Sequence, residues 1–191
     1  MSTFYELTYV VDPVSDDLVD SLYEAGLDVN VSGHDGLTFL ATTVVADDPV
    51  DGAFEFAQAL QSFGIKVLRL DLNLVNRAAI ADICGVTRQA VTPWVNTPGL
   101  VNRFPKPYTA VKGPLWVWSE VNDWLRRSRK DFFEDSCYPT PTQIEEFNVR
   151  WTRTTTQVNL GVPQVWDTVQ PQSVEVSDWT IHRETMEVKY D

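Results

Sequence analysis

The sequence predicts an α+β fold in three consecutive parts, residues 1–75, 76–130 and 131–191. Strand and helix patterns alternate through the first part in the order βαββαβ, whereas the second part opens with two short helical patterns on either side of a glycine. The charges change sign at the same two boundaries. The first part holds 13 acidic and 2 basic residues, the second 3 and 9, and the third 11 and 4. A basic module therefore lies between two acidic ones.

The composition is that of a folded protein. The chain has 191 residues, of which 43% are hydrophobic and 22% charged, and this is enough to bury a core without disulfides or metals. Its two cysteines, Cys84 and Cys137, are far apart and show no paired spacing. The sequence has neither the pattern of an export signal nor an apolar run of membrane-spanning length. We therefore expect a cytoplasmic protein without a membrane partner.

Each element of the first part has a local signal: alternating apolar residues for strands, apolar residues three or four apart for helices, and a cap or glycine at each end. The expected elements are a strand at 5–11, a helix at 16–25 after Ser15, strands at 29–32 and 37–46 around Asp35-Gly36, a helix from Pro49 to Gly64, and a strand at 66–73. This order predicts a ferredoxin-like βαββαβ domain.

No residue of the first part forms a recognisable catalytic or metal-binding motif. The pairs Asp16-Asp17 and Asp47-Asp48 stand where helices begin and where carboxylates favour the helix dipole, so we interpret them as solvated helix caps rather than metal ligands. His34 and His182 lack a neighbouring histidine, and phosphate-binding glycine loops and nucleophile motifs are absent. The sequence therefore predicts no enzyme activity, no metal site and no cofactor.

The basic module begins with two short helices at a tight turn. Asn76 is expected to cap a helix over 77–84, Gly85 to supply the turn, and Thr87 to cap a second helix. The apolar residues of both helices fall on facing sides, which is the pattern of a helix-turn-helix. The alternative is an αα-hairpin that binds no ligand.

The second helix exposes Arg88, Gln89 and Thr92 near its start, where proteins that read the major groove place their base contacts. Pro93 follows inside the same helix and removes a hydrogen bond to Gln89. We therefore expect this helix to end after Val91 or to bend.

A break at Arg103-Phe104-Pro105-Lys106-Pro107 follows the second helix. Two short strands are expected at 108–111 and 115–118, joined by a Lys112-Gly113-Pro114 turn that forms a wing. Ser119 is expected to cap a further helix whose carboxyl end carries Arg127.

In residues 76–127 the segments IADICGVTRQAV, FPKP and GPLWVWSEVNDWL occur in the order typical of one protein group. This part resembles the winged helix-turn-helix of the MerR, excisionase and AlpA-like group, and its placement after an α+β domain resembles small DNA-binding proteins of actinobacteria. The resemblance implies that Arg88, Gln89 and Thr92 face bases and that Arg103, Lys106 and Lys112 lie toward phosphates. The full set of candidate DNA-binding residues is Arg77, Thr87, Arg88, Gln89, Thr92, Arg103, Lys106, Lys112 and Arg127.

The third part is predicted to be an acidic α+β carboxy-terminal appendage. A break at 138–142 precedes a short helix from Thr142 to Phe147, and residues 152–160 and 174–190 have a β-like composition. Three tryptophans, Trp151, Trp166 and Trp179, indicate that this part packs on the first domain or on a partner.

The leading hypothesis is a sequence-specific protein for double-stranded DNA, acting as a transcriptional regulator of bacterial or phage origin. Because one winged module buries little surface, we expect a homodimer on paired half-sites, with acidic outer parts for dimerisation or effector binding. Two other hypotheses remain open. One is an antitoxin whose acidic segment neutralises a basic toxin, and the other is an acidic interaction or DNA-mimicking protein that uses the winged fold as a scaffold.

Overall fold

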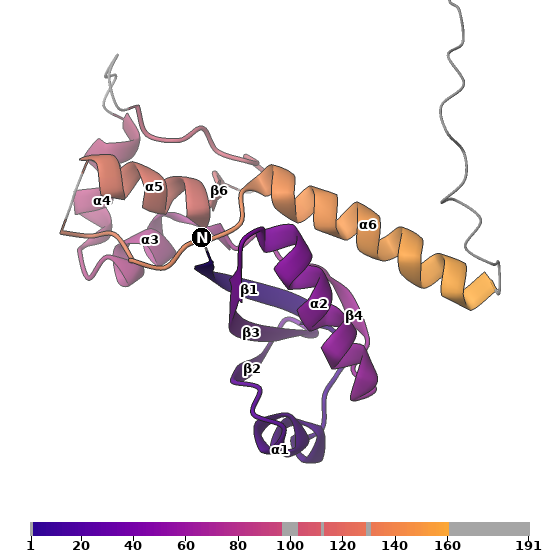
Figure 1. The fold of residues 1–191 in the computed structure, drawn as a ribbon. Coiled ribbons are helices and arrows are strands. Elements are labelled where there is room, and N and C mark those ends of the chain that lie inside the picture. Colours follow the sequence, from indigo (N-terminus) through magenta and orange to yellow (C-terminus); the bar gives the residue numbers. More distant parts are fainter. Residues whose placement is uncertain (1, 97–102, 112, 129–130, 161–191) are drawn as a thin grey trace, which may run out of the picture.

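The computed structural model describes residues 2–96, 103–111, 113–128 and 131–160 (Figure 1). The predicted mixed α+β class is confirmed, with a small antiparallel sheet and six helices among the described residues. The elements in chain order are β1 (Thr3–Val11), α1 (Asp16–Glu24), β2 (Val29–His34), β3 (Leu37–Ala46), α2 (Pro49–Ser62), β4 (Val67–Leu70), β5 (Leu74–Val75), α3 (Arg77–Ile83), α4 (Arg88–Asn96), β6 (Trp116–Val117), α5 (Trp118–Ser128) and α6 (Pro141–Leu160).

The first four strands form one antiparallel sheet in the order β2-β3-β1-β4. Tyr9 of β1 lies at its centre, paired with Leu40 of β3 on one side and Leu70 of β4 on the other. Its ring is buried, and its hydroxyl donates a 2.8 Å hydrogen bond to the carbonyl of Ala53 in α2. This bond ties the central strand to the helix that covers it.

The hairpin between β2 and β3 turns at Asp35-Gly36, as predicted. Asp35 has φ 49° and Gly36 φ 78°, so both residues lie in the left-handed region. A two-residue turn of this kind matches the twist of the strands, and it favours Asp or Asn followed by Gly.

Helix α2 packs closely on β3. Asp48 caps its first turn by accepting hydrogen bonds from the amides of Val50 and Asp51, which confirms its interpretation as a helix cap. Gly52 faces the strand at short range, because a Cβ at this position would lie 2.6 Å from the Cβ of Ala46. The absence of a side chain at Gly52 therefore sets how closely helix and sheet approach.

Helix α6 completes the core of the first unit. Ile144, Phe147 and Trp151 are buried in the same hydrophobic cluster as Tyr9 and Phe54. The Trp151 indole N–H donates a 2.9 Å hydrogen bond to the carbonyl of Val67 in β4. The expected packing of Trp151 on the first part is thus confirmed, while Trp166, Trp179 and 174–190 lie outside the described residues.

The expectations for α6 itself were wrong in two respects. The helix runs from Pro141 to Leu160, so it is longer than the predicted 142–147 and replaces the β-like segment expected at 152–160. It begins after Thr140, which forms a capping box with Gln143: the Thr140 amide donates to the Gln143 side chain, and the Gln143 amide donates to the Thr140 hydroxyl.

A second core holds the basic module. It is built from α3, α4, α5 and the short β5–β6 ladder, and its buried aromatic residues are Trp94, Phe104, Trp116, Trp118 and Trp124. The expected wing is only partly formed. Residues Thr109 and Leu115 make an isolated bridge, but β6 pairs with β5 and Trp118 already belongs to α5. Ser119 therefore lies inside α5 rather than at its cap.

The chain returns from the second core to the first through residues 131–140, which we call the strap. Phe132 and Phe133 pack against the second core, and the carbonyl of Cys137 accepts a 2.8 Å hydrogen bond from the amide of Glu6 in β1. Asn148 in α6 then covers β4, because its side chain both accepts from the Leu70 amide and donates to the Leu70 carbonyl. The β4 side of the sheet is thus closed by the strap and α6.

Candidate nucleic-acid interface

The turn between α3 and α4 is built from local signals. Asn76 accepts hydrogen bonds from the amides of Ala78 and Ala79, and Thr87 accepts one from the amide of Ala90. Gly85 has φ 64°, a conformation that a residue with a Cβ adopts only at a cost. Caps and glycine together make α3 and α4 meet at a tight angle.

The same turn separates a buried side from an exposed one. Ile80, Ala81 and Val91 are fully buried between the two helices. Thr87, Arg88 and Gln89 are exposed at the start of α4. The structure therefore presents a cationic and an amide side chain side by side at the amino end of a helix, where the helix dipole also favours an anion.

Two features of α4 bear on the expectations for it. Of the two alternatives, an end after Val91 is excluded, because the helix continues through Pro93 to Asn96. Thr92 is half-buried, and its hydroxyl donates a 3.2 Å hydrogen bond to the carbonyl of Arg88. This internal bond uses the Thr92 donor that was expected to face a base.

The segment before β6 places two further cations in solvent. Phe104 is buried edge-on against Trp116 and Trp124, and the Pro105 carbonyl accepts a 3.1 Å hydrogen bond from the Trp116 indole. Arg103 and Lys106, on either side of these anchors, are exposed. Their backbone is therefore held while their charged ends stay free.

The remaining candidates differ in their surroundings. Arg127 is exposed near the end of α5, where its Nε donates to the carbonyl of Asp123. Arg77 is half-buried at the start of α3, and its Nε is buried without a hydrogen-bond partner in the described part. Lys112 lies outside the described residues.

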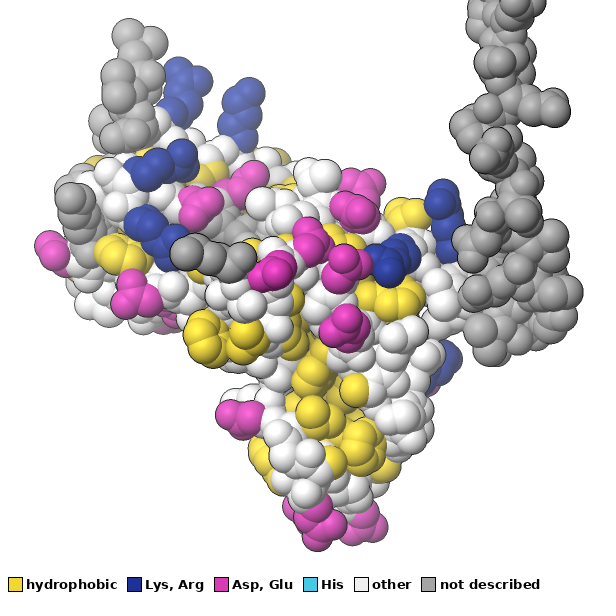
Figure 2. All heavy atoms as spheres, in the orientation of Figure 1, with side chains coloured by type: hydrophobic (Ala, Val, Ile, Leu, Met, Phe, Trp, Pro, Cys, Tyr) yellow, Lys and Arg dark blue, Asp and Glu magenta, His cyan; other side chains and the backbone are white. Residues whose placement is uncertain are grey.

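The cations that the structure describes in the basic module lack described carboxylate partners. In the described part of the chain, Lys66, Arg69 and Arg150 each form an ion pair with an aspartate. By contrast, no described basic residue of 76–128 is within salt-bridge distance of a described carboxylate; these are Arg77, Arg88, Arg103, Lys106, Arg126 and Arg127. Figure 2 shows dark blue side chains gathered at the end of the molecule that holds α3, α4 and α5, while the α1 end is magenta. The positive charge there is open to an anionic partner.

Glu134 in the strap orders this unit, and the sequence did not single it out. Its Oε2 accepts hydrogen bonds from the Trp118 indole at 2.8 Å and from the Tyr138 hydroxyl at 2.6 Å. Its backbone carbonyl accepts from the side chains of Asn122 and Arg126, and its amide donates to Asn122. The position of Glu134 directly after Phe132 and Phe133 was the available signal.

Two titratable groups beside Glu134 are held neutral. Burial, followed by the hydrogen bond to Glu134, raises the pKa of Tyr138 well above its ordinary value. Burial and, secondarily, the Glu134 charge raise the pKa of the Cys84 thiol to about 11. Cys84 is thus a packed, protonated side chain at neutral pH rather than a reactive thiolate.

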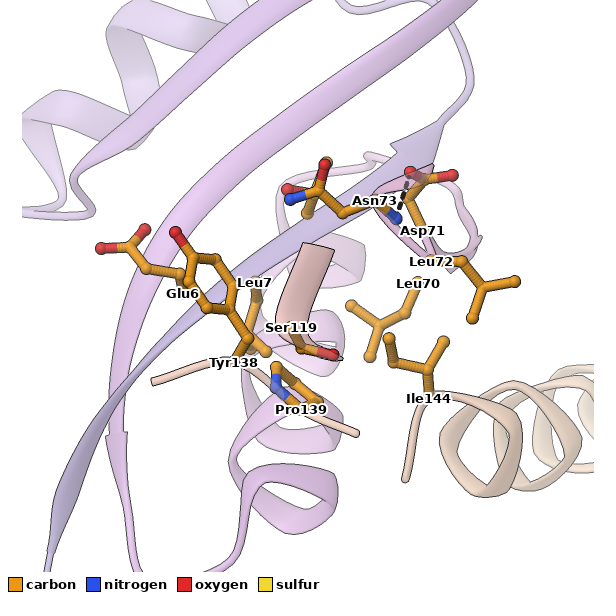
Figure 3. A pocket seen from close by; sticks show the side chains of 11 residues that line it. Glu6, Leu7, Leu70, Asp71, Leu72, Asn73, Ser119, Tyr138, Pro139 and Ile144 are labelled. Carbon is orange, nitrogen blue, oxygen red and sulfur yellow. Dashed lines mark hydrogen bonds between the residues drawn. The ribbon is translucent and has the colours of Figure 1, made fainter. Parts of the chain in front are cut away.

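A small cavity lies where the two cores meet (Figure 3). It is lined by Leu7 and Leu70 from the sheet, Ser119 from α5, and Tyr138 and Pro139 from the strap, among others. Its volume of about 20 Å³ is enough for about one water molecule, far below that of an ordinary ligand pocket. The Ser119 hydroxyl is buried without a hydrogen-bond partner in the described part of the chain. This cavity is therefore too small to hold an effector molecule.

Comparison of the chain with protein-family models, with curated proteins and with solved structures found no match. Among the residues that the structure describes, no helix has the length and apolar character to span a membrane. Within the same residues, no three His, Cys, Asp or Glu side chains are grouped as metal ligands would be.

Proposed function

We propose that this chain is a sequence-specific double-stranded-DNA-binding protein that regulates transcription, with α4 as the recognition helix. The observation that carries the proposal is the exposed Arg88-Gln89 pair at the start of α4, directly after the Gly85 turn. An arginine there can bind guanine O6 and N7 in the major groove, and a glutamine can bind adenine N6 and N7.

The charge distribution supports the same conclusion. A protein with a net charge of −12 is repelled by DNA as a whole, so binding requires a local cationic surface. Arg103, Lys106 and Arg127 are exposed and free of carboxylate partners in the described part, as phosphate contacts would be. On this proposal they fix the register on the backbone, while Arg88 and Gln89 select the bases.

The proposal includes two fold assignments, one for the first domain and one for the basic module. The β1-α1-β2-β3-α2-β4 order and the strand order β2-β3-β1-β4 support a ferredoxin-like first domain. The two helices at the Gly85 turn and the Thr109–Leu115 bridge support a winged helix-turn-helix of the MerR, excisionase and AlpA-like kind. The protein acts as a homodimer, because two half-sites are needed for tight specific binding by so small a module.

The test is selection of bound sequences from random double-stranded DNA by the purified full chain at low salt. We expect a recurring motif, and we expect the Arg88→Ala, Gln89→Ala double variant to lose it while keeping its fold by circular dichroism. The matched control is Arg153→Ala, since Arg153 is an exposed arginine on α6. Failure of the folded wild-type chain to retain any DNA would overturn the proposal and favour an αα-hairpin scaffold without a DNA ligand.

A further inference from the structure

The four-stranded sheet has a second face that points away from the core. Its inner face carries Leu7, Tyr9 and Leu40, which pack in one hydrophobic cluster with α2 and α6. The alternate residues of β1 and β3 point to the other side, because side chains alternate along a strand. We call this side, which includes Phe4, Val45 and their neighbours in alternation, the outer face.

The outer face exposes large apolar side chains. Phe4 in β1 and Val45 in β3 are directly paired across the strands, and they are 65% and 59% exposed. Leu37, on the same side of β3, is 40% exposed. Exposed apolar surface of this kind, which the Glu6–Thr43 pair interrupts, is typical of a protein–protein contact.

The outer face is also the part of the first unit with the least charge. Of the 13 acidic residues in 1–75, 12 lie on α1, α2 or the connections between elements, and only Glu6 lies on a strand. Glu6 accepts a 3.1 Å hydrogen bond from Thr43 on the same face. Arg69 of β4, which is paired with Val10, also lies on this face and forms an ion pair with Asp71. Thr8, Asn30 and Ser32 are uncharged.

This distribution of charge favours a second copy of the chain as the partner of the outer face. A basic protein would be attracted to the acidic helices and loops, where nearly all the carboxylates lie, rather than to the outer face. Two copies of this chain repel each other everywhere on the first unit except where carboxylates are scarce. A face with few carboxylates can pack on its own copy, as a two-fold symmetric contact requires.

We propose that the outer face of the β2-β3-β1-β4 sheet is the homodimer interface, with a second copy of this chain packed on it sheet to sheet. With strands about 4.8 Å apart and a rise of about 3.3 Å per residue, the four strands give the face a flat area of about 460 Å². Standard interfaces bury about 800 Å² per partner, so the face with its bordering loops approaches the required size. This assignment deepens the proposed function, because it supplies the two modules that paired half-sites need.

The test is the dimer dissociation constant of the full chain without DNA, measured by analytical ultracentrifugation. We expect a concentration-dependent dimer and a loss of affinity of about a hundredfold in Val45→Glu, because the new charge enters a two-fold interface twice. The matched control, Val149→Glu on α6, places the same change on a valine that is 44% exposed and leaves the constant unchanged. Phe4→Ala, which adds no charge, weakens the dimer as well, and circular dichroism verifies the fold of each variant.

The outcomes separate this inference from the DNA-binding proposal. Arg88→Ala keeps the dimer, and Val45→Glu still binds non-specific DNA at low salt through its intact basic module. A chain that stays monomeric at high concentration, or a dimer that Val45→Glu and Phe4→Ala leave unchanged, overturns the interface whether or not DNA is bound.

Discussion

The indole N–H of Trp118, at the start of α5, donates a 2.8 Å hydrogen bond to Oε2 of Glu134 in the strap. The Tyr138 hydroxyl donates to the same oxygen, so one carboxylate satisfies two partly buried donors. Replacing Glu134 by alanine leaves both donors without this partner. We expect Glu134→Ala to lower the free energy of unfolding by about 2–3 kcal/mol, as measured by urea denaturation. Glu145→Ala, on the exposed side of α6, is the control and leaves the midpoint within error.

Arg88→Ala tests base recognition. Because a bidentate arginine–guanine contact discriminates by about 1–3 kcal/mol, we expect the specific site to be bound more weakly by this amount, while random DNA is bound nearly as before. Fluorescence anisotropy with selected and scrambled duplexes measures both affinities. If binding to both duplexes is weakened equally, Arg88 contacts a phosphate and not a base.

Lys106→Ala tests backbone contact. Loss of one phosphate contact weakens binding to specific and random DNA alike and reduces the slope of log affinity against log salt by roughly one unit. The salt titration is repeated with Lys66→Ala, which removes a lysine paired with Asp12 on the first unit. An unchanged salt slope for the folded Lys106→Ala variant would show that DNA does not contact this segment. The same experiment with Lys112→Glu tests the predicted wing.

Cys84 offers a chemical test of the packing around the strap. A thiol pKa of about 11, against an ordinary 9.0, lowers the thiolate fraction at pH 8 about a hundredfold. In a Cys137→Ser background, we expect iodoacetamide to label the folded protein slower by at least this factor than the urea-unfolded chain. Equal rates would show that Cys84 is not buried against the strap in solution.

Trp151→Ala tests the contribution of α6 to the first core. Trp151 stacks on Phe147, meets Phe54 edge-on and donates to the Val67 carbonyl, so its removal leaves a cavity and an unpaired carbonyl. We expect a loss of about 3–5 kcal/mol in the free energy of unfolding. Truncation after residue 140 has the larger effect, because it also removes Ile144 and Phe147. A truncated chain with unchanged unfolding would show that α6 is dispensable.

The elements that could be predicted from sequence are those with local causes. Asp35-Gly36 specifies its own turn, and Asn76, Gly85 and Thr87 specify the ends of α3 and α4 through caps and a left-handed glycine. These signals involve residues within four positions of one another. No knowledge of the remaining chain is needed to interpret them.

The predictions from sequence were wrong where residues far apart in the chain determine the local structure. The threonine-rich composition of residues 152–156 favours a strand. Phe147 and Trp151, however, are four residues apart and both pack in the first core, and a helix places such residues on the same side. The hydroxyls of Thr152, Thr154 and Thr155 then donate to carbonyls four residues earlier, which satisfies them within α6. The role of Glu134 likewise depends on Trp118, 16 residues away, and on Asn122.

The return of the chain through the strap has a mechanical consequence. The first core takes residues from both ends of the described chain. The basic module is therefore an insertion within one domain and not a separate domain joined by a single linker. It is anchored where it leaves, at the bond from the Trp118 amide to the Asn73 carbonyl, and where it re-enters, at Cys137 against Glu6. These two attachment points prevent the rotation of the basic module against the first core that a single linker would allow. In the proposed dimer, the distance between recognition helices is thus set by the protein, and half-sites separated by a few extra base pairs are bound poorly.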